Sequence, residues 1–287
     1  MLEINHMTQL GFKLDDIRAR AKSVGTSSRT PLKHELLDKL MGKIIGAQCS
    51  GRTPCSKNFL AIDLCAGDGA DTMGEGSSSP AIIRKHLMDY RGNKLNRSAI
   101  FYEKDAATFK RLSDRHADCS RITLYNEDSR MMPLSTVHDR GTDSVFIYAD
   151  PNNIDQLPIT PELMKSITPY TLFLITLGCN VAGLKRISID HRAEWVKMAA
   201  MIVQSVNSFH DIILVTLNKD SSQWAYLMII PLAWSKDYIE VVKKIGDKNW
   251  TGGVTAISMK HDGYQSLWDK FRELFLTTEE QKNHKSL

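Results

Sequence analysis

From about residue 57 onward, short apolar runs alternate with polar segments and with segments of helical period. Five of these runs have the length and composition of buried strands. They are Phe59–Leu64, Ala99–Tyr102, Ile122–Tyr125, Ser144–Ala149 and Thr171–Leu177. This alternation is typical of a parallel sheet with helices on both faces, so it predicts an α/β, doubly wound fold.

Helices are expected between these strands, at Pro80–Tyr90, Ala106–His116 and His191–Asn207. Two late apolar runs, Ile212–Leu217 and Ala225–Ile230, are separated only by a short polar turn. A parallel crossover needs about a dozen residues or more, so this pair is predicted to be antiparallel. The chain should therefore form a sheet of about seven strands with an antiparallel hairpin at one edge.

The two ends of the chain are predicted to add helices, because Lys33–Ile45 and Gly263–Phe275 each carry an apolar face. We divide the chain into a basic, helical N-terminal extension (residues 1–56), an α/β domain (57–234) and a C-terminal extension (235–287). The last helix is expected to pack on the core. Its apolar face would also suit a contact between subunits of a homo-oligomer.

Composition narrows the class of protein. The longest apolar stretches are far shorter than the roughly 20 residues that span a bilayer, and the N-terminus lacks the pattern of a secretion signal. Five cysteines form no CxxC pair, which argues against a disulfide framework and a zinc site. We expect a cytoplasmic protein without membrane association and without a bound metal.

Positive charge is concentrated towards the N-terminus. The net charge is +4, and residues 18–57 contain nine Lys or Arg but only two acids, Glu35 and Asp38. Such a block could steer the protein towards the phosphates of nucleic acid, or it could be a solvated helix face with a flexible loop. Both interpretations stay open.

The most specific chemical signal is the acid Asp63, at the end of the first predicted strand, followed by Gly67 and Gly69. Glycines allow a sharp turn and close approach of the backbone to a ligand. The carboxylates of Asp63 and Asp68 would repel a pyrophosphate and attract an ammonium or sulfonium group. Thr72 also stands where a dinucleotide site would have its third glycine. The pattern favours S-adenosylmethionine over NAD.

The strand order, the Asp63 motif with its Ala66–Gly69 turn, and an acid after the next strand resemble class I S-adenosylmethionine-dependent methyltransferases. The resemblance implies a Rossmann-like sheet in which this turn packs against the methionine moiety and Asp63 contacts it. It implies that Glu103 accepts hydrogen bonds from the ribose hydroxyls, and that Asp128 lies near the adenine amino group. The alternatives are a surface acid at a strand end for Glu103 and the start of a turn for Asp128.

The segment Asp150-Pro151-Asn152-Asn153 directly follows the fourth predicted strand. Amino methyltransferases carry there an Asp/Asn/Ser-Pro-Pro-aromatic tetrapeptide that orients the target amino group, so the resemblance implies a reaction site at these four residues, centred on Asp150. Here Asn152 replaces the second proline and Asn153 replaces the aromatic ring, which weakens the case for a flipped base. A Pro-Asn turn that ends a strand is the structural alternative.

A narrower resemblance is to the three-Cys-motif partner family of methyltransferases. It is carried by Thr30–Leu37, Ala66–Gly69 and Gly76–Pro80. Asp68 stands where that family has proline, so the similarity supports the fold more than a substrate.

The sequence as a whole predicts an S-adenosylmethionine-dependent methyltransferase that acts on an amino group of DNA or RNA. One alternative is a methyltransferase for a protein or a small molecule. The other is a catalytically silent protein of the same fold that binds a partner, which would suit the atypical segment after Asp150.

Overall fold

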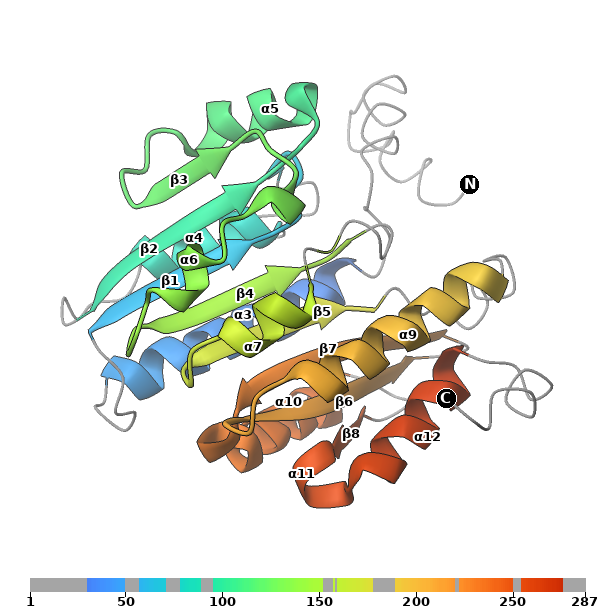
Figure 1. Ribbon diagram of the computed structural model, residues 1–287. Helices are drawn as coiled ribbons and strands as arrows, with labels where there is room; N and C mark the ends of the chain where they lie inside the picture. Colours follow the sequence, from blue (N-terminus) through green and yellow to red (C-terminus); the bar gives the residue numbers. More distant parts are fainter. Residues whose placement is uncertain are drawn as a thin grey trace.

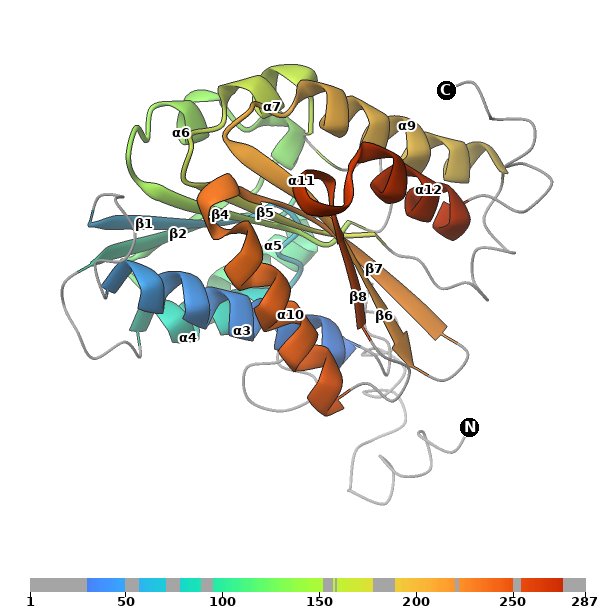
Figure 2. The ribbon, with the colours of Figure 1, turned by 90° about the horizontal axis from the view of Figure 1, so that it is seen from below.

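The computed structural model shows a single sheet with helices on both faces (Figures 1 and 2). It describes residues 30–49, 57–70, 78–88, 95–151, 157, 159–177, 189–219, 222–249 and 254–275.

The strands are β1 (Asn58–Asp63), β2 (Asn96–Tyr102), β3 (Ile122–Tyr125), β4 (Ser144–Ala149), β5 (Thr171–Thr176), β6 (His210–Lys219), β7 (Ser222–Pro231) and β8 (Val254–Ser258). They lie in the order β3-β2-β1-β4-β5-β7-β6-β8. Strands β1 to β5 are parallel, whereas β7 is antiparallel to β5 and to β6, and β8 is antiparallel to β6. The predicted doubly wound, Rossmann-like sheet with an antiparallel edge is confirmed. Strand β8 is an addition to the expected seven.

The helices are α3 (Thr30–Cys49), α4 (Ser79–Met88), α5 (Ala106–His116), α6 (Ser135–His138), α7 (Pro161–Ser166), α9 (Ile189–Ser205), α10 (Ser235–Asn249), α11 (Met259–Asp262) and α12 (Tyr264–Phe275), with 3-10 turns η1 (Ser129–Met131) and η3 (Leu232–Trp234). Figure 2 shows α3, α4, α5 and α10 on one face of the sheet, and α6, α7, α9, α11 and α12 on the other. None of the described helices combines the length and apolar character that crossing a membrane requires.

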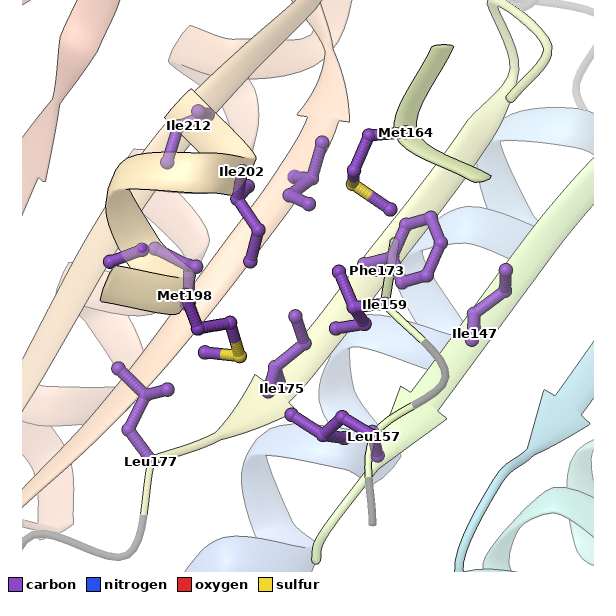
Figure 3. Close-up of a cluster of buried hydrophobic side chains, with 14 of the residues drawn as sticks. Ile147, Leu157, Ile159, Met164, Phe173, Ile175, Leu177, Met198, Ile202 and Ile212 are labelled. Atoms are coloured by element: carbon purple, nitrogen blue, oxygen red, sulfur yellow. The ribbon is translucent and has the colours of Figure 1, made fainter. Parts of the chain in front are cut away.

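The central strands are apolar along their whole length because both faces of the sheet are covered. On one face, Phe173 and Ile175 of β5 belong to the same buried cluster as Met164 of α7 and Met198 of α9 (Figure 3). On the opposite face, the strands pack against the buried apolar stripe of α3. The helix predicted at Lys33–Ile45 is thus present and longer than expected.

Helix α3 also packs against α4 and α10. Its buried residues and those of α10 belong to one cluster with side chains of the sheet. The division of the chain at residues 56 and 234 stays a prediction, and the structure adds that segments on both sides of these boundaries share one core.

A buried carboxylate joins β6, β8 and α10. Asp211 of β6 is fully buried and accepts hydrogen bonds from Ser235 Oγ (2.5 Å), Ser258 Oγ (2.6 Å) and the Lys260 N–H (3.0 Å). Ser235 begins α10, and Ser258 ends β8 and caps α11. One side chain of β6 therefore satisfies donors from two other segments at the antiparallel edge, the start of α10 and the junction of β8 and α11.

We expect Asp211→Ala to lower the free energy of unfolding by roughly 3 kcal/mol, because buried donors lose their shared acceptor. Urea denaturation followed by circular dichroism would measure the change. The matched control is Asp114→Ala, at an exposed position of α5, which should change stability by less than about 0.5 kcal/mol. Equal stability of the two variants would contradict this role of Asp211.

Candidate functional site

Three of the predicted site residues lie where the course of the chain reverses. Strand β1 lies between β2 and β4, and the chain runs outward to β3 before it returns to β4. In doubly wound sheets, ligands bind at this switch point, outside the carboxyl ends of the strands. Asp63 ends β1, Glu103 follows β2 and Asp150 follows β4, so three predicted acids lie at this edge. Within the described residues, no group of three or more His, Cys, Asp or Glu is arranged to hold a metal ion.

The turn after β1 is held by the strands on both sides of it. The Leu64 N–H donates to the carbonyl of Tyr148 in β4 (3.0 Å), and the Ala66 N–H donates to the carbonyl of Tyr102 in β2 (3.1 Å). The backbone at the end of β1 is therefore fixed relative to its two neighbours.

The two glycines of this turn meet different needs. Gly67 and Gly69 have φ values of 62° and 65°, in the left-handed region that glycine adopts without strain. A Cβ on Gly67 would meet no atom within 4 Å, whereas a Cβ on Gly69 would lie 2.7 Å from Nε2 of His116 and 2.9 Å from Cδ1 of Leu112. Gly67 thus presents open backbone, and Gly69 allows the turn to pack directly on α5.

Asp63 is fully buried. Its Oδ1 accepts a hydrogen bond from the Cys65 N–H (3.1 Å), but among the described residues Oδ2 has no hydrogen-bond partner. Burial raises the pKa of this carboxyl to about 7, and the charges of Asp150 and Glu103 act in the same direction. The Ser79 hydroxyl lies close enough to lower the pKa, although no hydrogen bond of normal geometry joins it to Oδ2. An orphaned, buried carboxylate oxygen fits a cationic ligand.

Asp68, in the same turn, is paired within the protein. Its carboxylate lies 3.4 Å from Nε of Arg111 and 3.7 Å from Nη1 of Arg115, both in α5. Its carbonyl oxygen also accepts a hydrogen bond from Arg115 Nη1 (2.6 Å). The expectation that Asp68 itself would repel a pyrophosphate is thus weakened, and the electrostatic case for a cationic ligand rests on Asp63.

Glu103 is half-buried and anchored to β3. Its N–H donates to the Tyr125 carbonyl (3.1 Å), and its carbonyl accepts from the Asn126 amide (2.9 Å). Oε1 accepts from the Asp105 N–H (2.8 Å), while Oε2 has no partner among the described residues. A carboxylate fixed through one oxygen, with the other available as an acceptor, fits a ligand that carries hydroxyl groups.

Asp128 follows β3 and caps η1. Its Oδ1 accepts from the Arg130 N–H (3.0 Å), and Oδ2 accepts from Arg130 Nη2 (2.6 Å). Arg130 lowers the pKa of Asp128 to about 2. Both oxygens are engaged in the turn, as in the structural alternative, and a contact with adenine stays a prediction.

Asp150 is half-buried and Pro151 is buried, directly after β4. Asn152 and Asn153 lie outside the described residues. The catalytic role of this segment stays a prediction.

Neighbouring residues were not predicted as site residues. Tyr148 of β4 and Tyr226 of β7 are fully buried, and the charge of Asp150 acts on both. Each lies within an apolar run, so the sequence pattern predicts an ordinary core residue at both positions. Only the register of the strands brings them to the site. Cys65 also lies here, and burial, with the charges of Asp63 and Asp150, raises the pKa of its thiol.

Solved structures with a similar fold come from several bacteria. The Legionella pneumophila protein LPL1258 is 12% identical, and the match covers 80% of this chain and 95% of that chain at a TM-score of 0.49. An rRNA methylase from Streptococcus thermophilus is 10% identical (73% and 99% covered, TM-score 0.41). The N-methyltransferase NodS from Bradyrhizobium japonicum, in complex with S-adenosyl-L-homocysteine, is 9% identical (68% and 86% covered, TM-score 0.37). At these identities the similarity concerns the fold alone.

No family model matches this chain, and no curated protein sequence shows significant similarity to it. The narrower resemblance to the three-Cys-motif partner family stays a prediction.

The raised pKa of Asp63 makes the free energy of unfolding depend on pH. Its folded pKa of about 7 lies above the ordinary value of 3.8. Between these values the folded protein holds a proton that the unfolded chain has lost, so Asp63 lowers stability as pH rises from about 4 to 7. Asp63→Asn should therefore be more stable than the wild type at pH 8, by roughly 4 kcal/mol, and the difference should shrink towards pH 4.

Urea denaturation of both proteins at several pH values checks this expectation. An Asp63→Asn variant that is less stable than the wild type at pH 8 would mean that the protein itself stabilises the ionised carboxylate.

Proposed function

We propose that this protein is an S-adenosylmethionine-dependent methyltransferase that acts on an amino group of nucleic acid. The observation that carries the proposal is Oδ2 of Asp63, which is buried at the switch point of the sheet without a partner among the described residues. An unsatisfied buried acceptor costs about 1–3 kcal/mol, and more when it is charged. A positively charged group bound beside Asp63 would remove this cost.

Residues around the turn fit the parts of such a cofactor. Asp63 would hold the positively charged methionine portion, and the open backbone at Gly67 allows close approach. Oε2 of Glu103 would accept hydrogen bonds from the ribose, while Oε1 keeps the side chain in place through Asp105. When bound, S-adenosylmethionine supplies an electrophilic methyl group.

Asp150 would orient the acceptor. It follows β4, the strand next to β1, and its charge contributes to the raised pKa of Asp63. Its carboxylate would accept a hydrogen bond from the acceptor amino group, direct the nitrogen lone pair and stabilise the positive charge that develops on the nitrogen. Fixing the reacting groups in one orientation can supply much of the rate acceleration.

The choice of nucleic acid is supported by the basic block between residues 18 and 57. In the described part of this block, Lys39 and Lys43 of α3 are exposed. Exposed cations would contribute a salt-dependent attraction to phosphates.

Cofactor affinity tests the cofactor half of the site. By isothermal titration calorimetry, Asp63→Asn and Glu103→Gln should each weaken binding of S-adenosylmethionine by roughly tenfold or more, because each loses a charge-assisted contact. Asp114→Asn, an exposed change in α5, should bind like the wild type. Unchanged affinity in both site variants would contradict this assignment of the cofactor site.

Transfer of a radiolabelled methyl group to pools of DNA, RNA and protein tests the reaction. Label is expected in a nucleic acid pool. Asp150→Ala should reduce transfer by roughly 100-fold, because the acceptor loses its orienting group, while cofactor affinity changes little. Cofactor binding without transfer to any pool would favour the silent, partner-binding alternative, and label in protein would replace the proposed acceptor.

A further inference from the structure

Four buried oxygen atoms on one face of the sheet have no hydrogen-bond partner among the described residues. They are Oδ2 of Asp63 and the hydroxyl oxygens of Tyr148, Thr176 and Tyr226. Each of these four side chains is at most 1% exposed. Most buried polar side-chain atoms in folded proteins have a partner, so four such atoms on one face of the sheet fit a ligand that supplies the missing partners.

The register of the sheet places these side chains in one row. Asp63 of β1 is paired with Tyr148 of β4, which is paired with Leu174 of β5. Thr176 lies two residues further along β5, on the same face as Leu174, and is paired with Tyr226 of β7. Neighbouring strands are about 4.8 Å apart. The row thus crosses four adjacent strands near the carboxyl ends of the parallel ones, on the face covered by α3 and α10.

The row adjoins the predicted reaction residue. Burial raises the pKa of Tyr148 and of Tyr226 well above the usual value, and the charge of Asp150 adds to the effect on both. Both phenols are therefore neutral and keep their protons. The Thr176 hydroxyl lies near enough to Tyr148 to influence it, without a hydrogen bond of normal geometry between them.

The hydroxyl groups are not needed to fill the core. Phenylalanine and valine would occupy nearly the same volumes without burying a polar atom that lacks a partner. A ligand that forms hydrogen bonds with these hydroxyl groups would account for their presence beside a carboxylate at the switch point.

We propose that Tyr148, Thr176 and Tyr226 form a subsite that recognises the edge of an aminated nucleobase, on which an amino group stands next to a ring nitrogen. Hydroxyl groups both donate and accept hydrogen bonds, so they match an edge that combines N–H donors with an acceptor. The adjacent carboxylate of Asp150 favours the donor side of that edge. The proposal rests on the proposed function and extends it, because it names the residues that select the acceptor.

The test uses the full chain and two matched probes, cytidine and uridine, of which cytidine has an amino group beside an unprotonated ring nitrogen and uridine has a carbonyl beside a ring N–H. Binding is measured by calorimetry, with and without S-adenosyl-L-homocysteine. The wild type should bind cytidine roughly tenfold more tightly than uridine, because the Asp150 carboxylate accepts from the amino group of cytidine but would face the carbonyl oxygen of uridine, and Tyr148 and Tyr226 hold the base in that orientation. The double variant Tyr148→Phe/Tyr226→Phe should lose this preference, and Thr176→Val should reduce it.

Thermal unfolding supplies an independent measurement. Without ligand, the double variant should have a Tm equal to or above that of the wild type, because it removes two unsatisfied hydroxyls. Tyr264→Phe is the control, since Tyr264 is exposed on α12, on the opposite face of the sheet (Figure 2). It should change neither the Tm nor the preference for cytidine.

Three outcomes would overturn the subsite. They are equal binding of the two nucleosides by the wild type, an unchanged preference in the double variant, and a lower Tm that shows the hydroxyls to be structural. If a glutamine-containing peptide bound more tightly than cytidine, the ligand of the subsite would be a protein amide and not a nucleobase. Failure to bind S-adenosylmethionine would reject the proposed function instead, and the nucleoside comparison without cofactor would still decide on the subsite.

Discussion

The arrangement of the site depends on one carboxylate, Asp63, which is held inside the protein at the end of the central strand. The amides that follow it are hydrogen-bonded to carbonyls of β2 and β4, so the side chain cannot turn outward without breaking the sheet at that point. Burial works against its ionisation, and the charges of two further acids, Glu103 and Asp150, add to this effect. Carboxyl groups with a strongly raised pKa cluster at functional sites. The glycine turn, the acid after β2 and the acid after β4 all lie around this carboxylate, at the same edge of the sheet.

Most of the fold could be predicted because the central strands are buried on both faces and appear as continuous apolar runs. The antiparallel pair β6 and β7 followed from the shortness of their connection. Strand β8 escaped prediction for a physical reason. Val254–Ser258 lies at the edge of the sheet and is mostly half-exposed, so its sequence lacks the apolar run that marks the inner strands. The role of Asp211 depends on residues brought together only by the folded chain.

The positions of candidate residues were predictable where a residue directly follows a strand. Asp63, Glu103 and Asp150 each lie at the strand end that the local pattern predicted, and their functional roles stay predictions. The local pattern could not show that Asp68 is paired with two arginines of α5, because a helix distant in sequence supplies them. Nor could it separate Tyr148 from an ordinary core residue, since its significance comes from the register between strands.

Helix α5 contacts the site at both of its ends. Just before it begins, the Asp105 N–H holds Oε1 of Glu103, and its last turns carry the arginine that binds Asp68 and the histidine beneath Gly69. With no Cβ on Gly69, the turn rests directly on the helix. The helix therefore connects Glu103 with the glycine turn, so a tilt of α5 would displace both together and keep their spacing constant.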